Sequence, residues 1–113
     1  MGDEPVKTID GKVNYLEKIG LPLNSTLHVR LLDVSLQDVA AKELAVQITP
    51  NAENVGLNFN LTYKLADVLP GHTYAINASI SHEDRLIFTT TQQHRVELGV
   101  DYVKGQEVLV NRV

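Results

Sequence analysis

The sequence contains no cysteine and no tryptophan. Without thiols, disulfides, thiolate nucleophiles and cysteine-ligated metal centres are all excluded. No stretch approaches the roughly 20 consecutive apolar residues that a membrane-spanning helix needs. The opening residues, MGDEPVKT, also lack the apolar core of a signal peptide. We therefore expect any membrane attachment to come from outside this sequence.

An excess of positive charge is also missing. Ten Lys and Arg residues stand against fourteen Asp and Glu residues, which gives a net charge of -4, and neither sign gathers in a run. Nucleic-acid binding is excluded on this basis, because a protein that neutralises phosphates needs a basic patch. A chain of 113 residues fits one domain. We expect a flexible segment over residues 1–8 and a single domain over residues 9–113.

The dominant pattern is an alternation of apolar and polar residues with period two. Gly, Pro, Asn or Asp interrupts it every eight to twelve residues, which is typical of a sandwich or barrel. The pattern predicts strands over residues 11–19, 26–34, 44–49, 57–62, 74–80 and 85–91, with two shorter ones near 96–98 and 108–112. Between Ser35 and Lys42, the spacing of Ser35 and Asp38 allows one helical turn.

The aliphatic and aromatic rows of these strands are interpreted as two facing layers around a hydrocarbon interior. The predicted fold class is therefore all-β: a two-sheet antiparallel β-sandwich of about seven to eight strands, with an immunoglobulin-like or transthyretin-like Greek key. The expected interior rows are Val13, Tyr15 and Ile19; Leu27, Val29 and Leu31; Leu44, Val46 and Ile48; Leu57, Phe59 and Leu61; Tyr74, Ile76, Ala78 and Ile80; and Leu86 and Phe88.

The segment VLPGHTYAINASI, residues 68–80, carries the most specific structural signal. Pro70 and Gly71 predict a turn, and Tyr74 opens the strand that follows. This spacing resembles the tyrosine corner of immunoglobulin-like sandwiches, in which the phenol bonds to the backbone upstream.

Candidate chemical groups are few and scattered. His28, His72, His82 and His94 lie on four separate predicted elements without metal-binding spacing. His82, Glu83 and Asp84 are adjacent at a predicted hairpin loop, and three neighbouring residues cannot converge on one ion without other ligands. Three acids, Asp33, Asp67 and Asp101, border turns, where Asp bonds the local backbone. We therefore assign no catalytic, cofactor-binding or metal-binding residue.

The segment DGKVNYLEKIGLPLNSTLHVRLLDVSLQDVAAKELAVQIT resembles the opening of the YbaY and YscW group of envelope lipoproteins. The group's pattern is a Gly-x-Val strand, an apolar-Leu-Pro turn, a Leu-x-Val-x-Leu strand and an Asp-x-Ser-x-x-Asp connector. The sequence departs from the group at the predicted hairpin loop, where Glu83 and Asp84 stand in place of the Gly-containing turn that relatives often have. The matching residues are Gly11 and Val13; Leu21 and Pro22; Leu27, Val29 and Leu31; Asp33, Ser35 and Asp38; Phe59 and Leu61; Tyr74; and Leu86, Phe88 and Thr90.

The resemblance implies a β-sandwich held at the periplasmic face of a membrane by an N-terminal lipid. One branch of the group is described as type III secretion lipoprotein chaperones, or pilotins, which help secretin subunits localise and assemble. Our leading hypothesis is therefore a non-catalytic, cofactor-free interaction module, monomeric and anchored to the outer membrane, that binds a secretin or another envelope protein. The shared residues are structural, so the resemblance transfers no binding site.

Two other functions stay open. A binding domain for carbohydrate or another small envelope ligand would need aromatic stacking platforms. Because Tyr15, Phe59, Tyr74 and Phe88 belong to the predicted core, Tyr63 or Tyr102 would have to supply them. An enzyme is the least supported alternative, since its only candidate cluster is His82, Glu83 and Asp84.

Overall fold

The structure is a computed structural model that describes residues 5–16, 20–35, 41–98 and 103–113. Within these ranges it contains nine strands and two short helical segments. Their bounds are β1 (Val6–Asn14), β2 (Ser25–Asp33), β3 (Lys42–Thr49), α1 (Ala52–Val55), β4 (Asn58–Lys64), the 3₁₀ turn η1 (Leu65–Asp67), β5 (Tyr74–His82), β6 (Arg85–Thr89), β7 (His94–Val96), β8 (Val103–Leu109) and β9 (Asn111–Arg112).

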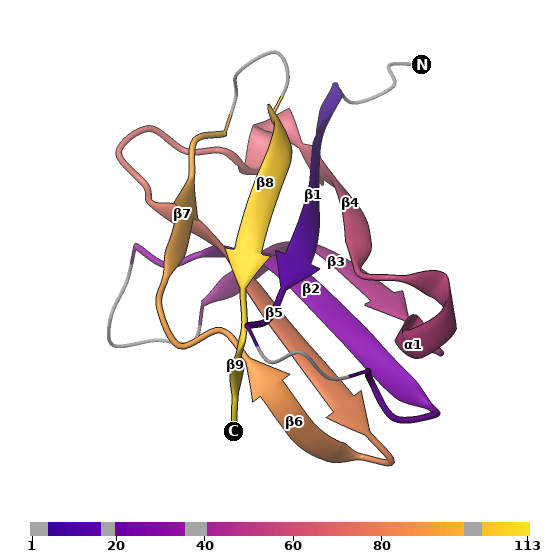
Figure 1. Cartoon of the computed structure of the whole chain (residues 1–113). Helices are drawn as coiled ribbons and strands as arrows, with labels where there is room; N and C mark the ends of the chain where they lie inside the picture. The colour runs from indigo at the N-terminus through magenta and orange to yellow at the C-terminus, as the bar shows by residue number, and fades with distance from the viewer. Residues whose placement is uncertain (1–4, 17–19, 36–40, 99–102) are drawn as a thin grey trace.

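The strands form two sheets that pack face to face (Figure 1). The larger has the order β3-β2-β5-β6-β9, with β7 pairing the beginning of β5. The smaller has the order β4-β1-β8. All ladders are antiparallel except β1 with β8, which run parallel. The predicted all-β sandwich is confirmed.

The core forms where β2 and β5 present matched aliphatic rows. Leu27, Val29 and Leu31 pair in register with Ile80, Ala78 and Ile76, and all six are at most 1% exposed. Each fully buried Val, Leu or Ile contributes roughly 1.5–3 kcal/mol to the free energy of unfolding. From the smaller sheet, the residues buried against these rows are Ile9, Val13, Phe59, Leu61, Tyr63 and Val108.

The first strand begins earlier than the alternation predicts. Residues 6–8, expected to belong to a flexible segment, pair with residues 62–64 of β4. The apolar–polar alternation does not reveal this part of the strand, because residues 6–8 show no alternating apolar pattern and Val6 is half exposed. Pairing with β4 makes these residues extended. β1 also ends at Asn14. Ile19 lies outside the described residues, as do residues 36–40 of the helical turn predicted between Ser35 and Lys42.

The orientation of β3 corrects the predicted interior rows. Ala45, Gln47 and Thr49 pair with the inward residues of β2, whereas Val46 and Ile48 are 46% and 57% exposed. Val46 and Ile48 were therefore assigned to the wrong face. Leu44 lies beside the register shift of this ladder and packs partly against the core.

Gln47 explains why β3 turns a polar row inward. Its Nε2 donates to the carbonyl of Asn58 at 3.2 Å and to Thr49 Oγ1 at 3.0 Å, and its Oε1 accepts from the amide of Asn60 at 2.8 Å. One side-chain amide thus takes the place of a neighbouring strand at the edge of β4. These bonds satisfy backbone groups of β4 at the margin where the two sheets meet.

A register shift also corrects Leu86. Phe88 pairs with Ile80 and is buried, but the ladder shifts before the pairing of Ser81 with Leu86. Because an extra residue in a strand reverses the face of the residues beyond it, Leu86 points outward and is 44% exposed. Ile87 packs partly against the core in its place.

Gly11 lies between β4 and β8 at a position with no room for a side chain. It pairs with Phe59 on one side and Gln106 on the other. A Cβ at this position would lie 2.5 Å from Cζ of Phe59 and would also collide with the backbone carbonyl of Gln106. The absence of a side chain at Gly11 therefore allows the Phe59 ring to cover β1.

We predict that Gly11→Ala lowers the free energy of unfolding by roughly 3 kcal/mol, because neither the buried ring nor the carbonyl can move aside freely. The measurement is urea denaturation followed by circular dichroism. Gly20→Ala is the matched control, since a Cβ there would meet nothing within 4 Å. A Gly11→Ala variant as stable as Gly20→Ala would contradict this packing.

Candidate functional site

A tyrosine corner lies at the end of the sandwich where β5 begins. The Tyr74 ring is buried, with 4% exposure. Its hydroxyl accepts a hydrogen bond from the amide of Leu69 at 2.7 Å and donates to the carbonyl of Asp67 at 3.4 Å. The predicted tyrosine corner is confirmed, and it ties the segment after η1 to the core.

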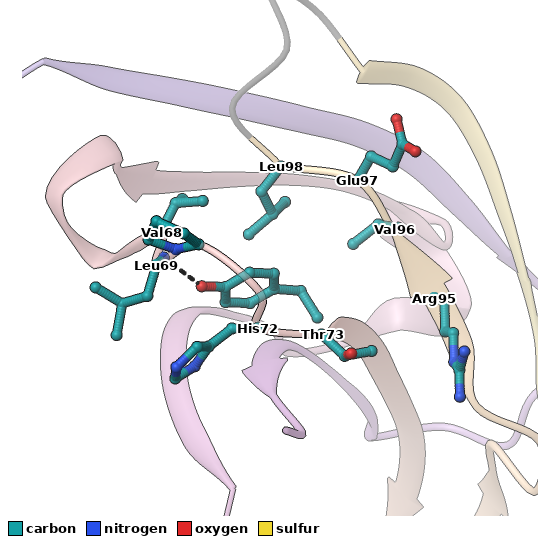
Figure 2. A pocket seen from close by; sticks show the side chains of 10 residues that line it. Val68, Leu69, His72, Thr73, Arg95, Val96, Glu97 and Leu98 are labelled. Atoms are coloured by element: carbon teal, nitrogen blue, oxygen red, sulfur yellow. Dashed lines mark hydrogen bonds between the residues drawn. The ribbon is translucent and has the colours of Figure 1, made fainter. Parts of the chain in front are cut away.

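Beside this corner, two paired segments separate and leave a groove. The last pairing between β5 and β7 joins Tyr74 to Val96. Beyond it, the residues before Tyr74 and those after Val96 border an open groove of about 660 Å³ (Figure 2). The residues that line it are Val68, Leu69, Pro70, His72, Thr73, Tyr74, Arg95, Val96, Glu97 and Leu98.

The groove is mostly apolar. Val68 and Leu69 lie on one side of it, and Val96 and Leu98 approach from the other (Figure 2). Leu69 is 44% exposed, so its side chain is open to a ligand. Arg95 and Glu97 supply one charge of each sign. Apolar walls with a few polar groups are typical of surfaces that hold a side chain or a short segment of a ligand.

Polar bonds to the end of β2 position the wall of the groove. Asp33 Oδ2 lies 2.6 Å from His72 Nδ1, and Asp33 Oδ1 accepts from the amide of Ser35 at 3.0 Å. The amide of Thr73 donates to Ser35 Oγ at 2.6 Å, and its carbonyl accepts from the amide of Val34 at 2.8 Å. The segment before Tyr74 is thereby attached to β2.

These bonds also change the acidity of Asp33. Desolvation by burial acts to raise the pKa of its carboxyl, but the hydrogen bonds from His72 and Ser35 outweigh it, so the pKa lies below the usual value. Asp33 thus stays charged while it orients the imidazole. Sequence reasoning placed Asp33 and His72 on separate elements and did not predict that they meet.

The other candidate residues stay apart. His28 lies on β2, His82 at the end of β5, and His94 on β7, where its Nε2 lies 2.9 Å from Gln106 Oε1. The described part of the chain contains no group of three or more His, Asp or Glu residues that could hold a metal ion. Asp67 forms an ion pair with Lys42 at 3.8 Å, and Asp101 lies outside the described residues.

The cluster at residues 82–84 forms a tight hairpin turn. Glu83 and Asp84, which connect β5 to β6, have φ angles of 50° and 65°. Two successive residues with positive φ are typical of a type I′ hairpin turn, which connects antiparallel strands with two residues. Glu83 is 71% exposed, and its carboxylate lies 3.8 Å from His82 Nε2. The predicted polar hairpin loop is confirmed.

The aromatic residues correct one expectation about ligand binding. Tyr63, proposed as a stacking platform, is 1% exposed and belongs to the core. It follows Phe59 and Leu61 at every second position of β4, a continuation that the predicted strand over residues 57–62 cut short. Phe59, Tyr74 and Phe88 are buried as predicted, and Tyr15 stacks on Phe88 with ring centroids 4.9 Å apart. Tyr102 lies outside the described residues.

Sequence reasoning missed the groove itself. The sequence predicted a turn at Pro70 and Gly71 and a short strand near Val96 and Leu98, but no groove between them. Nothing local to either segment showed that β7 pairs with the beginning of β5. The groove depends on that pairing and on its end at Tyr74.

Three comparisons relate this chain to known proteins. The model of a family described as "Type III secretion system lipoprotein chaperone (YscW)" matches residues 4–105. The uncharacterized lipoprotein YbaY of Escherichia coli K12 is 32% identical over 83 residues, which are 73% of this chain and 44% of that protein. The chain therefore spans less than half the length of that relative.

A solved structure is similar throughout. The alternative pilotin from the type II secretion system of Vibrio cholerae superposes with a TM-score of 0.85 at 33% sequence identity. The match covers 96% of this chain and 98% of that one. Separately, none of the helices in the described ranges is long and apolar enough to cross a membrane.

We predict that Asp33→Asn destabilises the protein at pH 6 and that the difference from wild type shrinks below about pH 4. Because the folded carboxyl has a lowered pKa, its contribution to stability is present above the unfolded pKa of about 3.9 and is lost as the pH falls through the folded value. Urea midpoints between pH 2.5 and 7 measure this. The exposed Glu107→Gln is the charge-matched control. A difference that stays constant down to pH 2.5 would show that the charge of Asp33 contributes nothing.

Proposed function

The chain belongs to the type III secretion system lipoprotein chaperone (YscW) family, and from this membership we propose that it is the non-catalytic binding domain of a bacterial envelope lipoprotein. In this proposal it acts as a pilotin: it holds a segment of a secretin-like protein while a lipid supplies the membrane address. The observation that carries the proposal is the similarity to a pilotin over nearly the full length of both chains.

The groove beside the tyrosine corner is the surface that best fits this role. Its volume of about 660 Å³ lies within the range of roughly 300–1,000 Å³ that is usual for ligand sites. The apolar side chains favour an apolar segment of the partner, and Arg95 and Glu97 would fix its direction. Hydrogen bonds already hold the segment from His72 to Tyr74 in place, so little conformational entropy is lost there when a ligand binds.

The proposed anchor would place the groove near the membrane. The carbonyl of Pro5, just before β1, accepts from the amide of Leu65 at 3.1 Å, at the start of η1. The chain therefore enters the sandwich beside η1, whose last residue, Asp67, bonds to the Tyr74 hydroxyl of the tyrosine corner. A lipid attached upstream would tether this same end, so the bound segment would lie close to the lipid surface.

We predict that Leu69→Lys weakens binding of a secretin by about tenfold or more, because the partner's apolar segment would leave a charge unpaired in the groove. The measurement is a titration of the purified domain with the C-terminal segment of the secretin encoded in the same genome. Leu69 is 44% exposed, so the substitution leaves the core intact.

Leu86→Lys is the matched control, because Leu86 is also 44% exposed but lies on β6, away from the groove. It should bind like wild type. Failure of the wild-type domain to bind up to 100 µM, a concentration corresponding to about -5.5 kcal/mol, would count against a pilotin for that secretin. Equal losses in both variants would count against the groove.

A further inference from the structure

The outer strand of the larger sheet has an open backbone edge. Among the residues that the structure describes, β3 pairs with β2 and with no other strand. Its central part, LAVQIT from Leu44 to Thr49, contains neither charge nor proline. Natural edge strands usually carry charges, prolines or bulges that prevent pairing with another chain. On β3 the charged residues, Lys42 and Glu43, and the register shift at Leu44 lie at one end, so the edge is regular from Ala45 to Thr49.

The corresponding edge of the smaller sheet is protected. There, the Gln47 amide donates to the carbonyl of Asn58 and accepts from the amide of Asn60. A strand that approached β4 at this point would have to displace both bonds. The protein thus blocks the edge of β4 with a side chain from β3, while the backbone of β3 has no such cover among the described residues.

The outward side chains of β3 add an aliphatic row to this edge. Val46 and Ile48 are 46% and 57% exposed. Across the ladder they lie next to Arg30 and His28 of β2, so no described aliphatic side chain pairs with them there. An exposed strand edge beside exposed β-branched residues is the combination that favours strand addition.

We propose that β3 pairs antiparallel with β3 of a second copy of this chain, so that the larger sheets of the two copies become continuous. A segment that fits this edge must be uncharged over about six residues and must carry aliphatic side chains at alternate positions. The chain itself presents such a segment in every copy, which is β3. A two-fold pairing of one surface with itself is the commonest form of homodimer.

One register satisfies the side chains on both strands. If Val46 lies opposite Val46 of the second copy, Ala45 lies opposite Gln47, and Ile48 of each copy lies diagonally across from Val46 of the other. The aliphatic rows then merge, and no like charges face each other. No residue of the groove lies on β3, so this pairing is independent of the proposed function.

The proposed pairing differs from the monomeric state that the sequence led us to expect. Because two strands make a small interface, we expect a dissociation constant on the order of 100 µM. For a protein held on a membrane surface, the high local concentration would favour the pair beyond what free solution allows.

Charge substitutions at Val46 test the proposal. Sedimentation velocity from 5 µM to 1 mM should show a monomer–dimer equilibrium for the wild type. Val46→Lys and Val46→Glu should each raise the dissociation constant at least tenfold, because like charges would then face each other across the two-fold axis. An equimolar mixture of the two variants should restore the dimer.

Leu86→Lys, which alters an equally exposed side chain of the same sheet, should dimerise like wild type. Circular dichroism should show that each variant is folded, because Val46 is 46% exposed. A wild type that stays monomeric at 1 mM would overturn the proposal. So would unchanged dimerisation of Val46→Lys, a mixture that associates no better than its components, or an equal effect of Leu86→Lys.

Discussion

The hydroxyl of Tyr74 makes the bonds on which the groove end of this molecule depends. Its ring belongs to the core, while its hydroxyl holds the amide of Leu69 and the carbonyl of Asp67. Because the ring is in the core and the hydroxyl bonds to the backbone, the segment that forms a wall of the groove is attached to the buried core of the sandwich. The bonds of Asp33, Ser35 and Thr73 fix the same wall from the side of β2. The groove is therefore preorganised by the fold.

The two margins of the sandwich, where the edge strands of the two sheets meet, are closed in different ways. Gln47 bonds to the backbone of β4 at one margin, and this use of an inward polar side chain obliges Val46 and Ile48 to face outward. At the other margin, the chain passes from β8 in the smaller sheet through Val110 to β9 in the larger one. Exposed Val46 and Ile48 are thus a consequence of how β4 is protected.

The sequence predicts features that follow from the local alternation of apolar and polar residues. It does not predict features that depend on which strands pair with each other. The rows of β2 and β5 and the corner at Tyr74 follow from the order of apolar residues and from Pro70 and Gly71. The orientation of β3 could not be predicted, because Leu44, Val46 and Ile48 look like an interior row until the bonds of Gln47 to β4 are known. Leu86 depends on a register shift.

The groove was beyond sequence reasoning for the same reason, since β5 and β7 meet only through tertiary pairing. The family resemblance, in contrast, could be recognised from the order of core and turn residues alone. It identified the class of protein but no binding residue, because those shared positions build the sandwich and leave its surface undetermined.

The proposed function requires that the partner's segment bind in the groove beside the tyrosine corner. Backbone amide chemical shifts, recorded while the secretin's C-terminal segment is added to the labelled domain, test it most directly. The account predicts that the amides of Leu69, Thr73 and residues 95–98 shift first and in proportion to occupancy. Shifts confined to the polar outer face of β4 and β1, around Asn60 and Lys12, with unchanged groove amides would contradict it.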